Sequence, residues 1–191
     1  MEISKTLYVK YMVCKCCIRI LKQELEQQGI QIHRIVLGEI DIKYESLKIT
    51  DFQIEKIIKD NGFEMVTNKD KILVEQIKIA VIELVHFANN MNSIIRNSDY
   101  LVEKLGYSYQ HLSAIFSKYE SYTLEKFVIL HKIEKVKEMI EYGDLTLSEI
   151  AFTMGYSSVQ YLSTQFKNIT GISVSDYKKS PDVDRKSIAE I

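Results

Sequence analysis

Three cysteines stand close together near the start of the chain, at positions 14, 16 and 17. Cys14 and Cys17 form a C-x-x-C pair, and two thiolates at this spacing can hold Cu(I) nearly linearly or supply half of a tetrahedral zinc site. The same pair could carry out dithiol redox chemistry or have no chemical role. We expect a soft-metal site for Cu(I), Zn or Cd with Cys14 and Cys17 as ligands and Cys16 as a third candidate.

A second set of polar side chains lies in two similar segments of the C-terminal half, where it could contact the edges of DNA bases. Side chains at the start of a helix that enters the major groove reach the bases most readily. Glutamine pairs with adenine, and an alanine can meet a thymine methyl group. The alternative at each position is an ordinary solvated side chain. The candidates are Tyr109, Gln110, Ser113, Ala114 and Lys118 in the first segment, and Ser158, Gln160, Ser163, Thr164, Gln165 and Lys167 in the second.

The element that would position the second set reads LTLSEIAFTMGYSSVQYLSTQFKNITG, residues 145–171. Its apolar residues recur at helical spacing up to Gly155, which ends one helix, and a serine pair opens the next. Ala151 is small enough for two helices to cross closely, and Gly155 can adopt a positive φ. The segment therefore predicts a helix-turn-helix.

A second copy of this pattern lies upstream, where the chain reads KLGYSYQHLSAIFSKYES. Gly-Tyr-Ser, Leu-Ser and Phe recur at a period of roughly 49 to 50 residues, which indicates an internal repeat. One long helix over residues 124–140 is predicted between the copies. We expect the apolar residues of the two recognition helices to be core residues. These are Leu112, Phe116, Leu162 and Phe166.

Two helix-turn-helix motifs joined by one helix resemble the AraC/XylS family of bacterial transcription regulators, over residues 72–178. Gly155-Tyr156, Phe166-Lys167 and the Gly-x-Ser-x-x-x-Tyr run of residues 171–177 match the signature of the family. Val174 replaces a usual proline, and Ala114 and Thr164 replace arginines that are frequent in the recognition helices. The resemblance implies a transcriptional regulator that binds specific sequences of double-stranded DNA.

The net charge of the predicted DNA-binding domain is unusual for a protein that binds DNA. Residues 91–178 hold nine Lys and Arg against ten Asp and Glu, a net charge of −1. Duplex binding usually draws much of its affinity from neutralised phosphates. The acids Glu134, Glu138 and Glu141 belong to the helix between the motifs rather than to the recognition helices. We therefore expect weak binding by one chain and useful affinity when two chains bind together.

The N-terminal third has a different hydrophobic pattern, which predicts the order β-α-β-β-α-β. This is the ferredoxin-like arrangement, so the fold class is α+β, with an all-α double helix-turn-helix domain after it. Gly38 and Glu39 form the turn between the second and third strands, and Asp51 is expected to cap the second helix. The predicted strands cover residues 6–13, 33–37, 40–44 and 64–67, and the helices cover residues 18–28 and 51–61.

The cysteines stand where the first strand passes into the first helix. Met12-Val13-Cys14-Lys15-Cys16-Cys17, with Gly62-Phe63-Glu64 before the last strand, resembles a heavy-metal-associated domain, whose loop binds soft cations. A helix N-terminus lowers a thiol pKa. Tyr11 departs from the glycine usual in that family, and Cys16 is an additional thiol. The alternative is a ferredoxin-like domain kept for dimerisation or protein contact.

Four parts follow from these patterns: residues 1–67, a connecting helix over 68–90, the double helix-turn-helix over 91–178, and a flexible tail over 179–191. The connecting helix is apolar on two faces, so it needs two partners. One face is expected to pack on the first helix-turn-helix. For the other face, which carries Ile79 and Ile82, we expect the N-terminal domain or a second subunit of a homodimer as the partner. The four histidines, at positions 33, 86, 111 and 131, share no metal-ligand spacing, and we interpret all as ordinary, His86 being the one of interest.

Composition excludes several classes of protein. The chain has 191 residues, 46% of them hydrophobic, and a formal net charge of −1. It lacks an apolar run of about 18 residues and a signal-peptide pattern, so we expect a cytoplasmic protein that does not enter a membrane. It also lacks a nucleophile–base–acid set and a phosphate loop, so we do not expect an enzyme.

The sequence therefore predicts a bacterial transcription regulator whose response to metal depends on Cys14 and Cys17. Metal would order their loop and change the packing of the first domain on the connecting helix, shifting the population that binds DNA. The main alternative is a soft-metal carrier or protein-interaction module whose helical domain no longer reads DNA. The low charge and the missing arginines favour that alternative, whereas the intact double motif argues against it.

Overall fold

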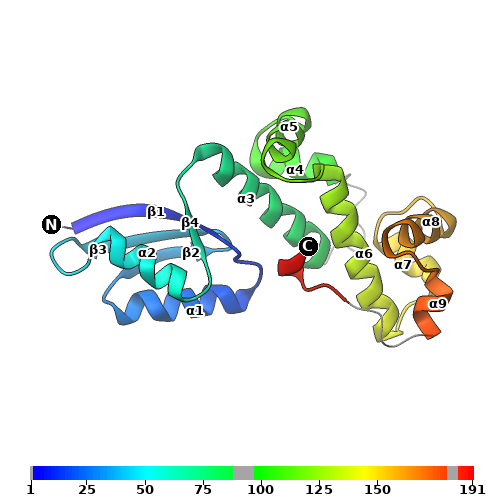
Figure 1. Cartoon of the computed structure of the whole chain (residues 1–191), viewed down its shortest axis with the longest axis horizontal. Helices are drawn as coiled ribbons and strands as arrows, with labels where there is room; N and C mark the ends of the chain where they lie inside the picture. The colour runs from blue at the N-terminus through cyan, green and yellow to red at the C-terminus, as the bar shows by residue number, and fades with distance from the viewer. Residues whose placement is uncertain (1, 88–96, 180–184) are drawn as a thin grey trace. The chain divides into compact units, whose positions relative to one another are not determined.

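The computed structural model describes residues 2–87, 97–179 and 185–191 (Figure 1). It divides into two compact units, one up to Ile79 and one from Ala80. The first unit holds a four-stranded antiparallel sheet with helices, and the second is helical, which confirms the α+β layout. Within the described residues, no helix is both long enough and apolar enough to cross a bilayer.

The N-terminal unit has the predicted element order. Its elements are β1 (Glu2–Lys10), α1 (Lys15–Gln27), β2 (Gln31–Val36), β3 (Glu39–Glu45), α2 (Asp51–Asp60) and β4 (Glu64–Val66). The strands lie in the order β2-β3-β1-β4, and every pairing is antiparallel. β1 is therefore central, between β3 and β4, and the loop that follows it carries the cysteines.

Alternation along the strands builds the core of this unit. Leu7 and Val9 of β1 and Ile40 and Ile42 of β3 are buried, while their neighbours in sequence are more exposed, as expected for a sheet with one covered face. The helices add buried residues at a spacing of four, which places each pair on one face. These are Leu21 and Leu25 of α1, and Ile54 and Ile58 of α2.

The cap of α2 differs from the prediction. Asp51 is the first residue of the helix, and Thr50 is the cap: its hydroxyl accepts a hydrogen bond from the backbone N–H of Gln53 at 3.3 Å. The Gln53 side chain accepts from the backbone N–H of Thr50 at 2.8 Å, which completes a capping box. The Asp51 carboxylate instead pairs with Lys5 at 2.7 Å.

The connecting helix consists of α3 (Lys69–Ile82) followed by one π-helical turn, η1 (Glu83–Phe87). Ile79 packs against the β2–β3 turn at Gly38, where a side chain on the glycine would collide with it. Ile82 is buried. The dimer prediction depends on these two isoleucines, and their packing gives it no support. Residues 88–90 of the predicted helix lie outside the described residues.

The C-terminal unit contains the two helix-turn-helix motifs (Figure 1). The first pair is α4 (Asn97–Leu105) and α5 (Tyr109–Tyr119), and the second is α7 (Leu147–Thr153) and α8 (Val159–Thr170). α6 (Leu124–Tyr142) joins them, and α9 (Val174–Lys179) follows. α6 ends at Gly143 and α8 at Gly171, both in the left-handed conformation typical of helix C-termini.

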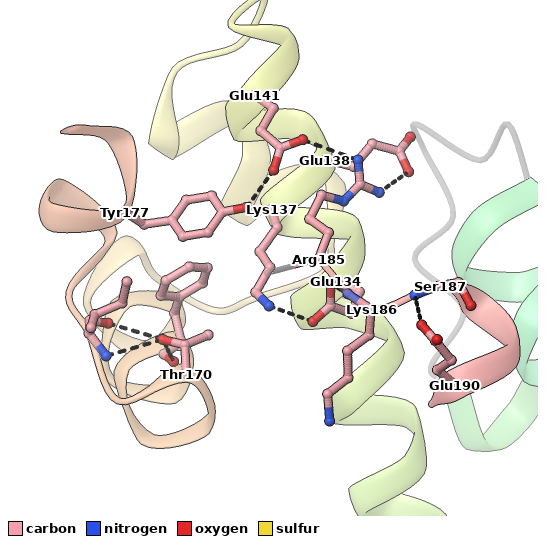
Figure 2. Close-up of polar contacts among 12 residues, drawn as sticks. Glu134, Lys137, Glu138, Glu141, Thr170, Tyr177, Arg185, Lys186, Ser187 and Glu190 are labelled. Atoms are coloured by element: carbon pink, nitrogen blue, oxygen red, sulfur yellow. Dashed lines mark hydrogen bonds and ion pairs between the residues drawn. The ribbon is translucent and has the colours of Figure 1, made fainter. Parts of the chain in front are cut away.

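The predicted flexible tail has defined contacts over residues 185–191, which include a short 3₁₀ turn, Ile188–Glu190. Arg185 pairs with Glu138 at 3.3 Å and with Glu141 at 3.2 Å (Figure 2). The backbone N–H of Lys186 donates to Glu134 at 3.1 Å. This part of the tail therefore lies along α6 through contacts that the sequence analysis did not anticipate.

Candidate nucleic-acid interface

The two recognition helices, α5 and α8, are held by the same pair of core positions. Leu112 and Phe116 of α5 are fully buried, and so are Leu162 and Phe166 of α8. From Tyr109 to Glu120 and from residue 159 to 170, the sequence of buried, half-buried and exposed positions is identical. The core prediction for these four residues is confirmed, and both helices present equivalent outer faces.

The turns before the recognition helices also match. Gly106 has φ 74° and Gly155 has φ 68°, the left-handed conformation that was predicted for Gly155. In the second motif the backbone N–H of Tyr156 donates to the carbonyl of Ala151 at 2.9 Å, which closes the turn. Ala151 is buried, as expected at a close helix crossing.

The outward faces carry most of the candidate base readers. In α5, Gln110, Ala114 and Lys118 are exposed at a spacing of four. In α8 the exposed candidates are Gln160, Thr164 and Lys167. The structure thus brings six of the eleven predicted site residues onto two equivalent helical faces. Tyr109, Ser113 and Ser163 are half-buried beside them.

Two candidates in the second motif are engaged by the protein itself. Ser158 is the N-cap of α8, and its hydroxyl accepts from the backbone N–H of Tyr161 at 3.1 Å. The side-chain carbonyl of Gln165 accepts from the hydroxyl of Tyr156 at 2.7 Å. Sequence reasoning overlooked His111 and Tyr161, which are exposed next to the two glutamines. Their place directly after Gln110 and Gln160 in the repeat was the available signal.

Aromatic pairs link each turn to its recognition helix. Tyr107 stacks on His111 with ring centroids 5.2 Å apart, and Tyr156 meets Tyr161 edge-on at 5.9 Å. Among the described residues, a cation lies above the turn tyrosine in the second motif alone: the ammonium of Lys132, on α6, lies 5.4 Å from the ring centroid of Tyr156.

The acids of α6 are largely neutralised within the unit. Glu134 pairs with Lys137 at 2.6 Å in a buried position, and Glu138 pairs with Lys135 at 2.6 Å (the first pair is drawn in Figure 2). Arg185 is shared between Glu138 and Glu141. Four of the ten acids counted in this domain thus lie on α6, and cations pair with three of them.

Two histidines that the sequence analysis interpreted as ordinary come together in this unit. Nε2 of His86, in η1, lies 3.1 Å from Nδ1 of His131, which is fully buried on α6. Burial lowers the pKa of His86 to about 4 and that of His131 to about 3, and each ring is therefore neutral near pH 7. They are 45 residues apart in the sequence, so no local spacing predicts the pair.

The cysteines occupy the predicted strand-to-helix junction. Cys14 is the N-cap residue of α1, its Sγ lies 3.5 Å from that of Cys17, and Cys16 is exposed. Burial acts to raise the pKa of Cys14, but hydrogen bonds with Cys17 and Cys16 outweigh it and leave that pKa lowered. Burial raises the pKa of Cys17. Tyr11 is held at φ 69°, a conformation suited to glycine.

Two thiols fit a two-coordinate soft metal better than a four-coordinate one. A tetrahedral zinc site needs four ligands. Among the residues that the structure describes, no group of three or more His, Cys, Asp or Glu side chains is placed to hold a metal ion. Cys14 and Cys17 therefore suit Cu(I), whereas Zn or Cd would need ligands from elsewhere.

Comparison with known proteins identifies the helical region. Residues 101–180 match the family model described as a helix-turn-helix domain. The Msm operon regulatory protein of Streptococcus mutans is 24% identical over 145 residues, which cover 76% of this chain and 47% of that protein. The chain therefore spans about half the length of this curated relative.

Two solved structures resemble the chain at lower similarity. The xylose-binding transcription activator XylR is 17% identical with a TM-score of 0.41, covering 84% of this chain and 36% of its own. The transcriptional regulator CdpR from Pseudomonas aeruginosa is 11% identical with a TM-score of 0.45, covering 84% and 51%. The helix-turn-helix domain match over residues 101–180 includes both recognition helices.

Proposed function

We propose that this chain is a DNA-binding transcriptional regulator of the AraC/XylS type. The observation that carries the proposal is the equivalence of α5 and α8: two recognition helices with identical burial are fixed to one helix, α6. A single such helix is common in proteins, but two equivalent outer faces in one domain suit two successive stretches of major groove. The match of residues 101–180 to the helix-turn-helix domain model supports the same function.

Sequence reading in this proposal depends on glutamine side chains. Gln110 and Gln160 are exposed at equivalent positions, and each can pair with an adenine through its amide oxygen and nitrogen. Ala114 and Thr164 stand one turn further along the two helices and can contact a thymine methyl group. Few cations stand on these faces, so base contacts contribute more of the affinity than in a strongly basic reader.

Selection from a pool of random duplexes tests the proposal. The purified, reduced chain should enrich one defined site at low salt, and the double variant Gln110→Ala/Gln160→Ala should enrich it far less. The variant removes two exposed amides without touching the core, so its fold should be unchanged by circular dichroism. If the wild-type chain enriches no sequence at low salt, the DNA-binding proposal is wrong.

The N-terminal unit is proposed to be a ferredoxin-like sensor of a soft metal. Two observations favour Cu(I): the sulfur atoms of Cys14 and Cys17 are 3.5 Å apart, and the described residues supply no further ligand set. When bound, the ion would tie α1 to the loop after β1. Regulation requires that the metal binds the DNA-competent state and the state that does not bind DNA with different affinities.

The metal proposal has its own test. Anaerobic titration with Cu(I) should show one tight site that the double variant Cys14→Ser/Cys17→Ser abolishes, while Cys16→Ser should retain it. DNA binding should then depend on a copper chelator in the wild-type chain only. Copper binding that survives the double variant would refute the site and leave DNA binding as a separate question.

A further inference from the structure

A cleft of about 430 Å³ opens within the C-terminal unit, between the two recognition helices and α6. Tyr109 of α5, Lys132 of α6 and Gln165 of α8 are among the residues that line it. If two recognition helices enter successive major grooves, a stretch of sugar-phosphate backbone must lie between them, and a cleft in that position can receive it. The cleft is large enough to admit a phosphate group.

Lys132 brings a positive charge to this cleft without a carboxylate partner among the described residues. Its ammonium donates to the backbone carbonyl of Met154 at 2.8 Å and lies above the ring of Tyr156. Burial lowers the pKa of Lys132, and no acid offsets that effect. A partly desolvated ammonium held by one carbonyl and one ring still has donors for an anion.

Gln165 adds neutral donors to the lining of the cleft. Because its side-chain carbonyl accepts from the hydroxyl of Tyr156 at 2.7 Å, its amide NH₂ group is turned away from that contact. Bidentate pairing with adenine needs both the oxygen and the nitrogen of the amide. With its oxygen engaged, Gln165 is suited to donate to an acceptor such as a phosphate oxygen. The corresponding position in α5 is Ile115, which has no such donor.

We infer that Lys132 and the NH₂ group of Gln165 bind one phosphate of the DNA backbone in the cleft between the recognition helices, with Tyr156 as the positioning residue. The inference rests on the proposed function and changes one prediction made from the sequence, in which Gln165 reads a base. Glu125 also lines the cleft and opposes an anion there. Its carboxylate therefore provides a variant with the opposite expected sign.

Binding of the selected duplex should be measured over a range of salt concentrations. Lys132→Gln should weaken binding about tenfold and reduce the slope of log affinity against log salt by about 1, because one phosphate contact with a cation is lost. Gln165→Leu should weaken binding about fivefold without changing that slope or the selected sequence, and Glu125→Gln should strengthen it. Lys126→Gln, an exposed lysine on α6 outside the cleft, is the matched control and should leave the slope unchanged.

Two further arms separate the competing explanations. A neutral methylphosphonate at the contacted phosphate should remove the difference between wild type and Lys132→Gln. If Gln165→Leu relaxes base preference at one position, or Lys132→Gln leaves the slope unchanged while folded, the inference is wrong. If inorganic phosphate at equal ionic strength binds the wild type but not Lys132→Gln and leaves duplex binding unchanged, the cleft holds free phosphate and the DNA assignment fails. Absence of any selected duplex for the wild type would instead refute the proposed function.

Discussion

The two helix-turn-helix motifs present the same recognition-helix geometry on different supports. Their helices have identical burial patterns, and both turns use a left-handed glycine. Beneath the first motif lies an aromatic cluster. The ring centroids of Phe116 and Phe127 are 5.3 Å apart, and those of Phe127 and His131 are 4.4 Å apart. The second motif is tied to α6 by a hydrogen bond from Lys132 to its turn.

The comparison shows which features a repeat preserves. Positions that decide how a recognition helix packs are the same in both copies, because the same crossing geometry must be met twice. Positions that face α6 differ, because the two ends of one helix cannot offer the same environment. The first motif therefore shares a hydrophobic core with buried titratable groups, and the second depends on a cation.

The largest expected effect comes from removing the core phenylalanine of either motif. Phe116→Ala and Phe166→Ala should each lower the free energy of unfolding by about 3 to 5 kcal/mol, since both rings are fully buried. Urea denaturation of each variant measures the loss. Nearly equal losses would support equivalent packing, whereas a loss below about 1 kcal/mol in one copy would break the equivalence. Replacing the exposed Phe152 by alanine is the control and should change little.

Acid should weaken the support of the first motif before that of the second. The pKa values of His86 and His131 lie near 4 and 3 in the fold, below the ordinary value of 6.5. Their contribution to stability is therefore complete above pH 6.5 and is lost progressively as the pH falls from 6.5 toward the folded-state pKa values. At pH 5 the loss is about 2 kcal/mol for each histidine. Lys135, Glu138 and Arg185 also act on His86.

Hydrogen exchange checks this difference between the copies. Between pH 7 and pH 5, after correction for intrinsic rates, amide protection in α5 should fall more than protection in α8. His131→Leu should flatten the pH dependence of the unfolding free energy, because one of the two buried rings no longer titrates. Equal loss of protection in both recognition helices would show that the unit opens as a whole and would remove the distinction.

Local patterns predicted the elements of both motifs well. The period of about 49 to 50 residues, the serine before each recognition helix and the glycine in each turn are all signals read within a few residues. Ser108 and Ser158 do cap α5 and α8, and the four apolar recognition-helix residues are buried. The βαββαβ order could be predicted for the same reason, since strand alternation and helix periodicity are local properties.

Contacts between distant residues could not be predicted in this way. The Lys132–Met154 bond joins residues 22 apart, and the His86–His131 pair joins residues 45 apart. The ion pair of Arg185 with Glu138 spans 47 residues. Each depends on tertiary packing, which no local spacing encodes. The sequence analysis likewise did not predict the hydrogen bond that the hydroxyl of Tyr156 donates to the side-chain carbonyl of Gln165.

Base readout should distinguish the copies by position rather than by size. Gln110→Ala and Gln160→Ala should each relax preference at one base pair of the selected site, by about 1 to 3 kcal/mol, at two positions separated along the DNA. Repeating the selection with each single variant measures this. Relaxation at the same position by both variants would mean that the two motifs do not read separate stretches of groove.

The turn glycines give the smallest effect and the sharpest test of what Lys132 contributes. Gly106→Ala and Gly155→Ala should each cost about 1 kcal/mol of unfolding free energy, because both residues have positive φ and neither lacks room for a methyl group. Gly→Asn at the same positions should cost less, since asparagine tolerates this conformation. If the turn of the second motif must be fixed for the carbonyl of Met154 to meet Lys132, Gly155→Ala should also weaken DNA binding more than Gly106→Ala. Equal effects on binding would mean that the bond from Lys132 stabilises the turn without organising the DNA-binding surface.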